Sequence, residues 1–194
     1  MADIHFAPDE TWMFRSDDDG RAYGGFTWAP THEWTTAPDW SPRPLYGGGL
    51  HGQSARYHGN TRPGTRLVLC AVKTSEIVCI EPSRDQIKVP RARIVAVNDE
   101  ALTFFGNHVP VALSLGKYAH PLPAGLTSIG GALYLEGYNY PLPAGLTSVG
   151  STLYLEGYNY PLPAGLTSVG GYLYLGGHPH PLPAGLTSIG GALY

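Results

Sequence analysis

The chain has 194 residues, a formal net charge of −3 from 12 basic and 15 acidic side chains, and two cysteines. This charge balance argues against a dedicated nucleic-acid binder, and two cysteines cannot build a disulfide framework. The 26 glycines and 18 prolines are together about twice as frequent as in an average chain. Such an excess is typical of low complexity, of collagen or of a regular repeat.

Residues 1–118 hold all but two of the charged side chains, and residues 1–110 are predicted to form a small α+β domain of mainly β structure. The run of aspartates at residues 17–20 ends in glycine and predicts a tight turn. It lacks the alternating ligand positions of a calcium loop. Strands are expected at residues 23–28, 66–73, 76–80 and 91–98. One short helix is expected at residues 53–58.

Three motifs stand near the start of this domain: Gly24-Gly-Phe-Thr-Trp28, Pro38-Asp-Trp40 and Gly48-Gly-Leu-His51. With the strand pair that follows them, they resemble an uncharacterised N-terminal domain of phage and prophage proteins, which is commonly followed by repeats. The resemblance covers residues 20–98. It implies a phage or bacterial protein located in the cytoplasm or in a virion, and it implies no particular activity.

His51 is the strongest single candidate for chemistry, because neighbouring glycines let a ligand approach the backbone and imidazole titrates near neutral pH. The competing interpretation is a structural histidine bonded to a turn carbonyl. With Ser54 and Tyr57, the segment is similar to the second NAD-contacting segment of ADP-ribosyltransferases. That resemblance implies Glu81 or Glu76 as the acidic residue. No motif predicts a metal site or another cofactor, and the tryptophans and cysteines are interpreted as core residues.

Residues 111–194 form a near-perfect repeat with a period of 20. The segment Pro-Leu-Pro-Ala-Gly-Leu-Thr-Ser begins at Pro121, Pro141, Pro161 and Pro181. This period predicts a solenoid, and the absence of Gly-X-Y triplets excludes collagen. Leu133 and Leu135 alternate with outward residues, as in a strand with one buried face. Each of about four coils is expected to contain one strand, a glycine corner and an extended return segment in a parallel β-solenoid.

The repeat reads Leu-Pro-x-Gly-Leu-Thr-Ser-Val-Gly-Gly-x-Leu-x-Leu-x-Gly over residues 112–194. This pattern resembles the short leucine-rich repeats of bacterial and bacteriophage proteins. It departs from that family at the usual asparagine position, where Gly137 and Gly157 stand instead. The resemblance implies that the solenoid is a binding scaffold.

Equivalent residues of stacked coils form columns with a spacing of about 4.8 Å. Outward aromatic columns are predicted to be the binding surface: Tyr134, Tyr154, Tyr174 and Tyr194; Tyr138 and Tyr158 with His178; Tyr140 and Tyr160 with His120 and His180. The competing interpretation is that stacked tyrosines only stabilise neighbouring coils. Hydroxyl columns starting at Thr127 and Ser128 could match ice or a polysaccharide, or could satisfy backbone groups.

The sequence therefore predicts a non-enzymatic binding or structural protein without a cofactor, in which the N-terminal domain caps the first coil. We expect a protein partner, or self-association through an uncapped last coil at residues 191–194, and neither nucleic acid nor a membrane. No signal peptide or membrane-spanning stretch is visible in the sequence. Two alternatives stay open: an ADP-ribosyltransferase-like enzyme, and a phage inhibitor of a host protein that uses the tyrosine surface.

Overall fold

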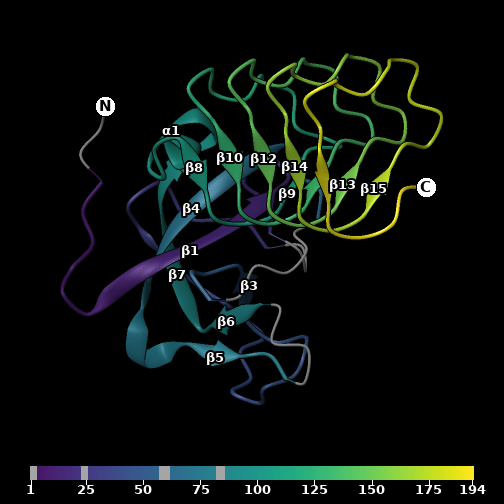
Figure 1. Ribbon diagram of the computed structural model, residues 1–194. Helices are drawn as coiled ribbons and strands as arrows, with labels where there is room; N and C mark the ends of the chain where they lie inside the picture. The colour runs from purple at the N-terminus through teal and green to yellow at the C-terminus, as the bar shows by residue number, and fades with distance from the viewer. Residues whose placement is uncertain (1–3, 23–25, 57–61, 82–85) are drawn as a thin grey trace. The chain divides into compact units, whose positions relative to one another are not determined.

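The computed structural model describes residues 4–22, 26–56, 62–81 and 86–194 (Figure 1). The chain divides into two compact units. The first comprises Met1–Thr61 and Arg66–Phe104, and the second comprises Arg62–Thr65 and Phe105–Tyr194. The fold is mainly β, with a small N-terminal domain followed by a parallel β-solenoid of about four coils, as the sequence predicts.

The first unit is built on an antiparallel sheet in the order β1-β4-β7-β2. Its strands are β1 (Glu10–Asp17), β4 (Arg66–Lys73), β7 (Arg91–Val97) and β2 (Trp34–Thr36). A second antiparallel sheet contains β3 (Leu50–Gly52), β6 (Ile87–Val89) and β5 (Val78–Cys79). The helical segments are the 3-10 helix η1 (Thr74–Glu76) and the α-helix α1 (Asn98–Thr103).

The strands predicted at residues 66–73 and 91–98 are confirmed as β4 and β7. The strand predicted at residues 76–80 is shorter than expected, because η1 occupies Glu76 and only β5 is extended. The helix predicted at residues 53–58 is wrong over its described part, where Gln53 forms a β-bridge instead. The strand predicted at residues 23–28 lies partly outside the described residues.

One face of the four-stranded sheet carries the core of the first unit. Met13, Val68 and Cys70 project from it and are fully buried. They pack with Trp28 and with apolar residues of the smaller sheet, Leu50, Ile87 and Val89. Burial raises the pKa of the Cys70 thiol to about 12, so this cysteine is an unreactive core residue, as predicted.

The turn predicted at the run of aspartates is confirmed. Asp18 and Arg21 exchange backbone hydrogen bonds of 3.2 and 3.0 Å, and Gly20 has a φ of 87° that favours glycine. The carboxylate of Asp17 accepts hydrogen bonds from Gly20 N at 3.2 Å and from Arg66 Nε and Nη2 at 2.8 and 2.7 Å. This bidentate pair ties the end of β1 to the start of β4.

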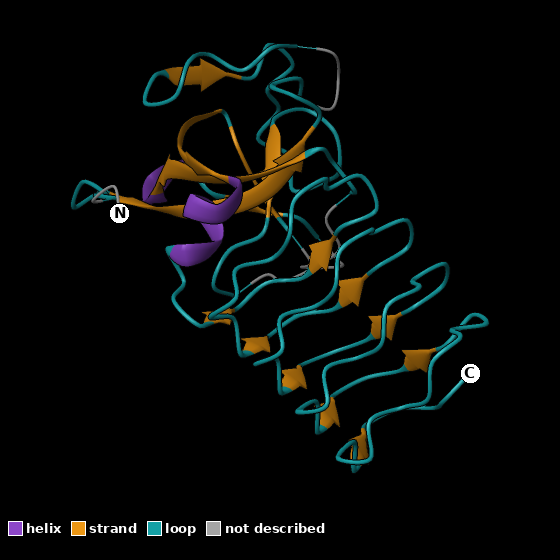
Figure 2. Ribbon diagram, turned by 90° about the horizontal axis from the view of Figure 1, so that it is seen from above, coloured by secondary structure: helices purple, strands orange, loops and turns teal. Residues whose placement is uncertain are grey.

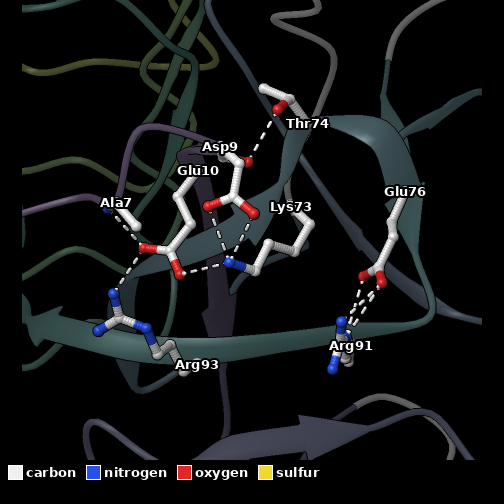
Figure 3. Close-up of polar contacts among 8 residues, drawn as sticks. All are labelled: Ala7, Asp9, Glu10, Lys73, Thr74, Glu76, Arg91 and Arg93. Atoms are coloured by element: carbon white, nitrogen blue, oxygen red, sulfur yellow. Dashed lines mark hydrogen bonds and ion pairs between the residues drawn. The ribbon is translucent and has the colours of Figure 1, made fainter.

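Ion pairs fasten the opposite end of the same sheet (Figure 3). Lys73 Nζ lies 2.9 Å from Asp9 Oδ1 and 3.4 Å from Glu10 Oε1, and Arg93 Nη2 donates to Glu10 Oε2 at 2.7 Å. The half-buried ring of Trp34 sits among three cations whose charged atoms lie 5.1–5.9 Å from its centre, Arg91, Lys73 and Arg93. Trp34 therefore makes cation–π contacts with these residues rather than packing in the apolar core.

The solenoid contains two parallel sheets of two-residue strands. Each coil contributes one strand to each sheet, except that the last coil adds only an isolated bridge, Leu193 to Leu173, to the second sheet. The first sheet contains β8 (His108–Val109), β10 (Ser128–Ile129), β12 (Ser148–Val149), β14 (Ser168–Val169) and β16 (Ser188–Ile189). The second contains β9 (Leu113–Ser114), β11 (Leu133–Tyr134), β13 (Leu153–Tyr154) and β15 (Leu173–Tyr174). Figure 2 shows these strands as two rows that follow the stack of coils. The return segment, predicted as merely extended, thus forms a sheet of its own.

Parallel pairing repeats with a register of one coil, so that Leu133 lies beside Leu153 and Leu153 beside Leu173. All three leucines are fully buried. The return segment adds Leu146 and Val149, also buried, from the opposite wall of the coil. Identical apolar residues therefore stack into one continuous core along the solenoid.

A glycine column lets consecutive coils approach each other closely after the first sheet. A Cβ atom built on Gly150 would overlap the carbonyl oxygen of Gly130 in the preceding coil. The same overlap recurs for Gly170 against Gly150 and for Gly190 against Gly170. Glycine is needed here because of packing between backbones, since none of these residues has a positive φ.

We predict that Gly150→Ala lowers the free energy of unfolding by about 1–3 kcal/mol, because the added methyl group has no space between adjacent backbones. Thermal and urea unfolding followed by circular dichroism measure this loss. Gly145→Ala is the matched control, because a Cβ there would lie 3.8 Å from the nearest atom. Its change should stay within about 0.5 kcal/mol. Equal destabilisation by both variants would contradict the close approach.

Candidate functional site

The tyrosine ladder is a row of aromatic rings on the outer side of the second solenoid sheet, one per coil: Tyr134, Tyr154, Tyr174 and Tyr194. Successive ring centroids lie 6.3, 5.2 and 4.8 Å apart, with interplanar angles of 36°, 45° and 10°. The first three rings are half-buried and the last is exposed. This column lies outward as predicted, and each ring packs against its neighbour along the row.

Strand geometry holds the ladder in place. Leu133 and Leu135 point into the core, so Tyr134 between them must point outward. The parallel register then sets Tyr154 beside Tyr134 in the next coil. The sheet therefore sets the backbone position of each ring, and each ring packs against its neighbours.

Tyr172 extends the ladder sideways and was not among the predicted site residues. It is exposed, and its ring centroid lies 6.0 Å from that of Tyr174. Ala132 and Thr152 stand at the equivalent positions of the preceding coils, so no repeated aromatic signal marks this column. The two-residue alternation from Tyr174 is the signal that could have found it.

The outward position predicted for Tyr138 and Tyr158 is wrong, because both side chains are buried, with 1% and 0% of their surface exposed. The preceding corner explains the difference. Gly137 and Gly157 have φ values of 77° and 71°, which interrupt the strand alternation and turn the next side chain inward. Together with Tyr118, which is also buried, they form an inner tyrosine column.

The inner column satisfies backbone groups inside the coil. The Tyr158 hydroxyl accepts a hydrogen bond from Leu142 N at 3.0 Å and donates to Tyr140 O at 3.3 Å. Tyr138 makes the equivalent bonds one coil earlier, and the two rings stack at 6.4 Å and 13°. His178 continues the stack in the next coil, with its ring 6.1 Å from that of Tyr158. Tyr138 and Tyr158 therefore hold the coils together rather than contact solvent, whereas His178 is half-buried.

The third aromatic column is partly exposed, but its polar atoms are used within the protein. The hydroxyl groups of Tyr140 and Tyr160 donate to backbone carbonyls of the preceding coil, Ala119 O at 2.8 Å and Asn139 O at 2.9 Å. His180 Nε2 lies 2.8 Å from the equivalent oxygen of Asn159. Tyr140 and Tyr160 thus join successive coils through their hydroxyl groups.

The threonine column likewise bonds to the backbone. Thr147 Oγ1 donates to Thr127 O at 3.0 Å, and Thr167 Oγ1 donates to Thr147 O at 3.1 Å. The backbone nitrogen atoms of the same threonines bond to the same carbonyls. This arrangement favours backbone satisfaction over recognition of ice or a polysaccharide, because the hydroxyl protons already have acceptors.

His51 lies in β3 of the first unit, directly opposite Lys88 of β6. Its side chain is half-buried, and its Nε2 atom is buried without a hydrogen-bond partner. Burial lowers the pKa of His51, and the positive charges of Arg15 and Lys88 lower it further. Asp39 is the acidic residue whose charge opposes this shift. Together these effects favour the neutral form of the His51 imidazole.

Tyr57 and Glu81 are the residues predicted to act with His51. Tyr57 lies outside the described residues. Glu81 is exposed, and its backbone nitrogen donates to Pro44 O at 2.7 Å. The carboxylate that acts on His51 is that of Asp39, which accepts a hydrogen bond from Gly49 N at 3.1 Å. The ADP-ribosyltransferase alternative stays a prediction.

The glycines beside His51 have a structural explanation. Lys88 is 1% exposed, and its Nζ atom donates to Leu45 O at 2.8 Å and Gly47 O at 3.0 Å. The loop closes over this buried ammonium with φ values of 86°, 59° and 122° at Gly47, Gly48 and Gly49. A Cβ on Gly49 would lie 2.8 Å from the Trp40 ring. The loop therefore requires glycine to enclose Lys88.

Comparison with protein-family models, curated proteins and solved structures finds no match to this chain. Within the described ranges, no helix has the length and apolar character needed to cross a membrane. The same part of the chain contains no group of three or more histidine, cysteine or acidic side chains that could hold a metal ion. The tyrosine ladder is a predicted site column whose rings do lie outward and pack along the row.

We predict that Tyr158→Phe lowers the free energy of unfolding by about 1–3 kcal/mol, because it leaves the buried Leu142 N–H without its acceptor. Urea unfolding followed by circular dichroism measures the loss. Tyr154→Phe is the control, since the Tyr154 hydroxyl bonds only at the surface, to Glu156. Its effect should stay within about 0.5 kcal/mol. A larger loss of unfolding free energy for Tyr154→Phe than for Tyr158→Phe would contradict the assignment of Tyr158 to the inner column and Tyr154 to the outer one.

We also predict that stability falls above about pH 10. Burial raises the pKa of Tyr158 to about 12 and also raises that of Tyr138, although a backbone N–H bond to each oxygen opposes the shift. Between the unfolded and folded pKa values, only the unfolded chain loses these protons, so rising pH favours unfolding. Urea unfolding at a series of alkaline pH values should give a shallower decline for Tyr158→Phe. If the unfolding free energy falls with pH at the same slope for the variant and the unaltered chain, ionisation of Tyr158 is not a cause of the decline.

Proposed function

We propose that this chain is a non-enzymatic binding protein whose solenoid presents the tyrosine ladder to a protein partner. The observation that carries the proposal is the row of outward rings at Tyr134, Tyr154 and Tyr174, held in register by parallel strands. Tyrosine is enriched in the buried centres of protein interfaces. It offers a large contact area and a polar hydroxyl group while ordering few rotatable bonds.

The rigidity of the ladder supports a binding role in energetic terms. Association usually loses affinity because flexible side chains must be ordered at the interface. Here the rings already pack against each other, with Tyr154 lying 6.3 Å from Tyr134 and 5.2 Å from Tyr174. Part of the entropy loss from ordering the rings therefore occurs when the chain folds and not when a partner binds. An inhibitor of a host protein would use the same surface in the same way.

A displayed library of random peptides tests the proposal. Selection is carried out on the full chain and, in parallel, on a variant that carries Tyr134→Ser, Tyr154→Ser and Tyr174→Ser. We expect peptides enriched on the unaltered chain to bind the variant at least about tenfold more weakly, since aromatic hot spots contribute about 2 kcal/mol or more each. Fluorescence anisotropy with the synthesised peptides measures the affinities.

The control removes one aromatic ring from another exposed surface, Tyr46→Ser in the loop of the first unit. It should leave the affinities unchanged. Circular dichroism must show that the triple variant remains folded, and single Tyr154→Ser and Tyr174→Ser variants replace it if it does not. Enrichment of the same peptides with the same affinities on both chains would refute the tyrosine ladder as the binding surface.

A further inference from the structure

The tyrosine ladder has a carboxylate beside it in two consecutive coils. Glu136 and Glu156 follow Tyr134 and Tyr154 by two residues and lie in the turns after β11 and β13. Both glutamates are exposed, and the Tyr154 hydroxyl donates to Glu156 Oε2 at 2.5 Å. In the following coil Gly176 stands at this position, so the row of carboxylates ends at Glu156.

These two charges lie in coils that contain no lysine or arginine. Lys117 is the one lysine or arginine in residues 105–194, and residues 118–194, which include both glutamates, have neither. Parallel strands bring equivalent positions to about 4.8 Å, where like charges repel. The pKa of the Tyr154 hydroxyl is raised, mostly by Glu156 and to a smaller extent by Glu136. The negative charge of both carboxylates is therefore felt at the tyrosine ladder.

We infer that the tyrosine ladder with Glu136 and Glu156 recognises a cationic side chain, preferentially an arginine, on an extended segment of the protein partner. This inference rests on the proposed function and specifies the chemistry of the partner. A guanidinium group can lie on the face of a tyrosine ring while its planar fork pairs with a carboxylate. It would also relieve the repulsion between the two glutamates.

The arrangement favours arginine over an apolar residue for a geometric reason. The Tyr134 and Tyr154 rings are tilted by 36° and separated by 6.3 Å, so each presents part of its π-face rather than a closed stack. The π-face carries the negative part of the ring quadrupole, and the adjacent carboxylates have the same sign. Aromatic and acidic groups therefore attract the same ligand charge at the same place.

The test uses the full chain and a labelled heptapeptide that alternates glycine with arginine. A second heptapeptide replaces each arginine by citrulline, which keeps the shape and removes the charge. Fluorescence anisotropy measures both affinities at low and at high salt. We expect the arginine peptide to bind at least about tenfold more tightly than the citrulline peptide, and to weaken as salt screens the charges.

Charge-matched variants locate the contact. Glu136→Gln combined with Glu156→Gln should weaken binding of the arginine peptide about tenfold. Glu33→Gln combined with Glu100→Gln removes the same net charge from exposed positions of the first unit and should change the affinity less than about twofold. Tyr154→Leu should weaken binding while both glutamates remain.

Three results would overturn the inference: equal binding of the arginine and citrulline peptides, equal losses from the two glutamine pairs, or no binding of either peptide. None of them decides the proposed function. That proposal fails only if peptides selected from the library bind the serine variant as tightly as the unaltered chain. If the citrulline peptide binds as tightly as the arginine peptide, and Tyr154→Ser and Tyr174→Ser abolish that binding, the tyrosine ladder is a binding surface without selectivity for cations.

Discussion

The close approach of backbones at the glycine column determines the rest of the solenoid. With Gly150 lying against Gly130, consecutive coils are close enough for short parallel strands to pair in two sheets. Pairing in turn imposes the one-coil register that stacks leucine on leucine and tyrosine on tyrosine. The two-residue strands are too short to be stable singly. Their stability comes from repetition, since each coil completes the hydrogen bonds and the apolar contacts of its neighbours.

Much of this architecture is predictable from the sequence, because it depends on local repetition. The period of 20 and the Leu133–Leu135 alternation indicate a coil with one buried strand face, and the structure has that face. The alternation fails at the corner, where the positive φ of Gly137 reverses the direction of the next side chain. Tyr138 therefore belongs to the core and Tyr134 to the surface, although both stand at even positions of one short segment.

The first unit is less predictable, because its contacts join residues far apart in the chain. The strand β1 begins the larger sheet, yet its sequence carries charged residues at both ends that pair only after folding, Asp17 with Arg66 and Glu10 with Arg93. The glycine cluster beside His51 has the composition of a ligand loop. Its structural cause is the buried ammonium group of Lys88, a residue about forty positions later that no local pattern connects to the loop.

The one-coil register also means that the solenoid has a natural unit of length. Each coil supplies its neighbour with the same carbonyl acceptors for threonine, the same space at glycine and the same apolar contacts. Excision or duplication of twenty residues would rejoin equivalent surfaces and preserve every class of contact. An insertion whose length is not a multiple of twenty would have to form a loop at a corner to leave the register of both sheets unchanged. The molecule is thus built so that genetic change can lengthen or shorten the tyrosine ladder in whole steps.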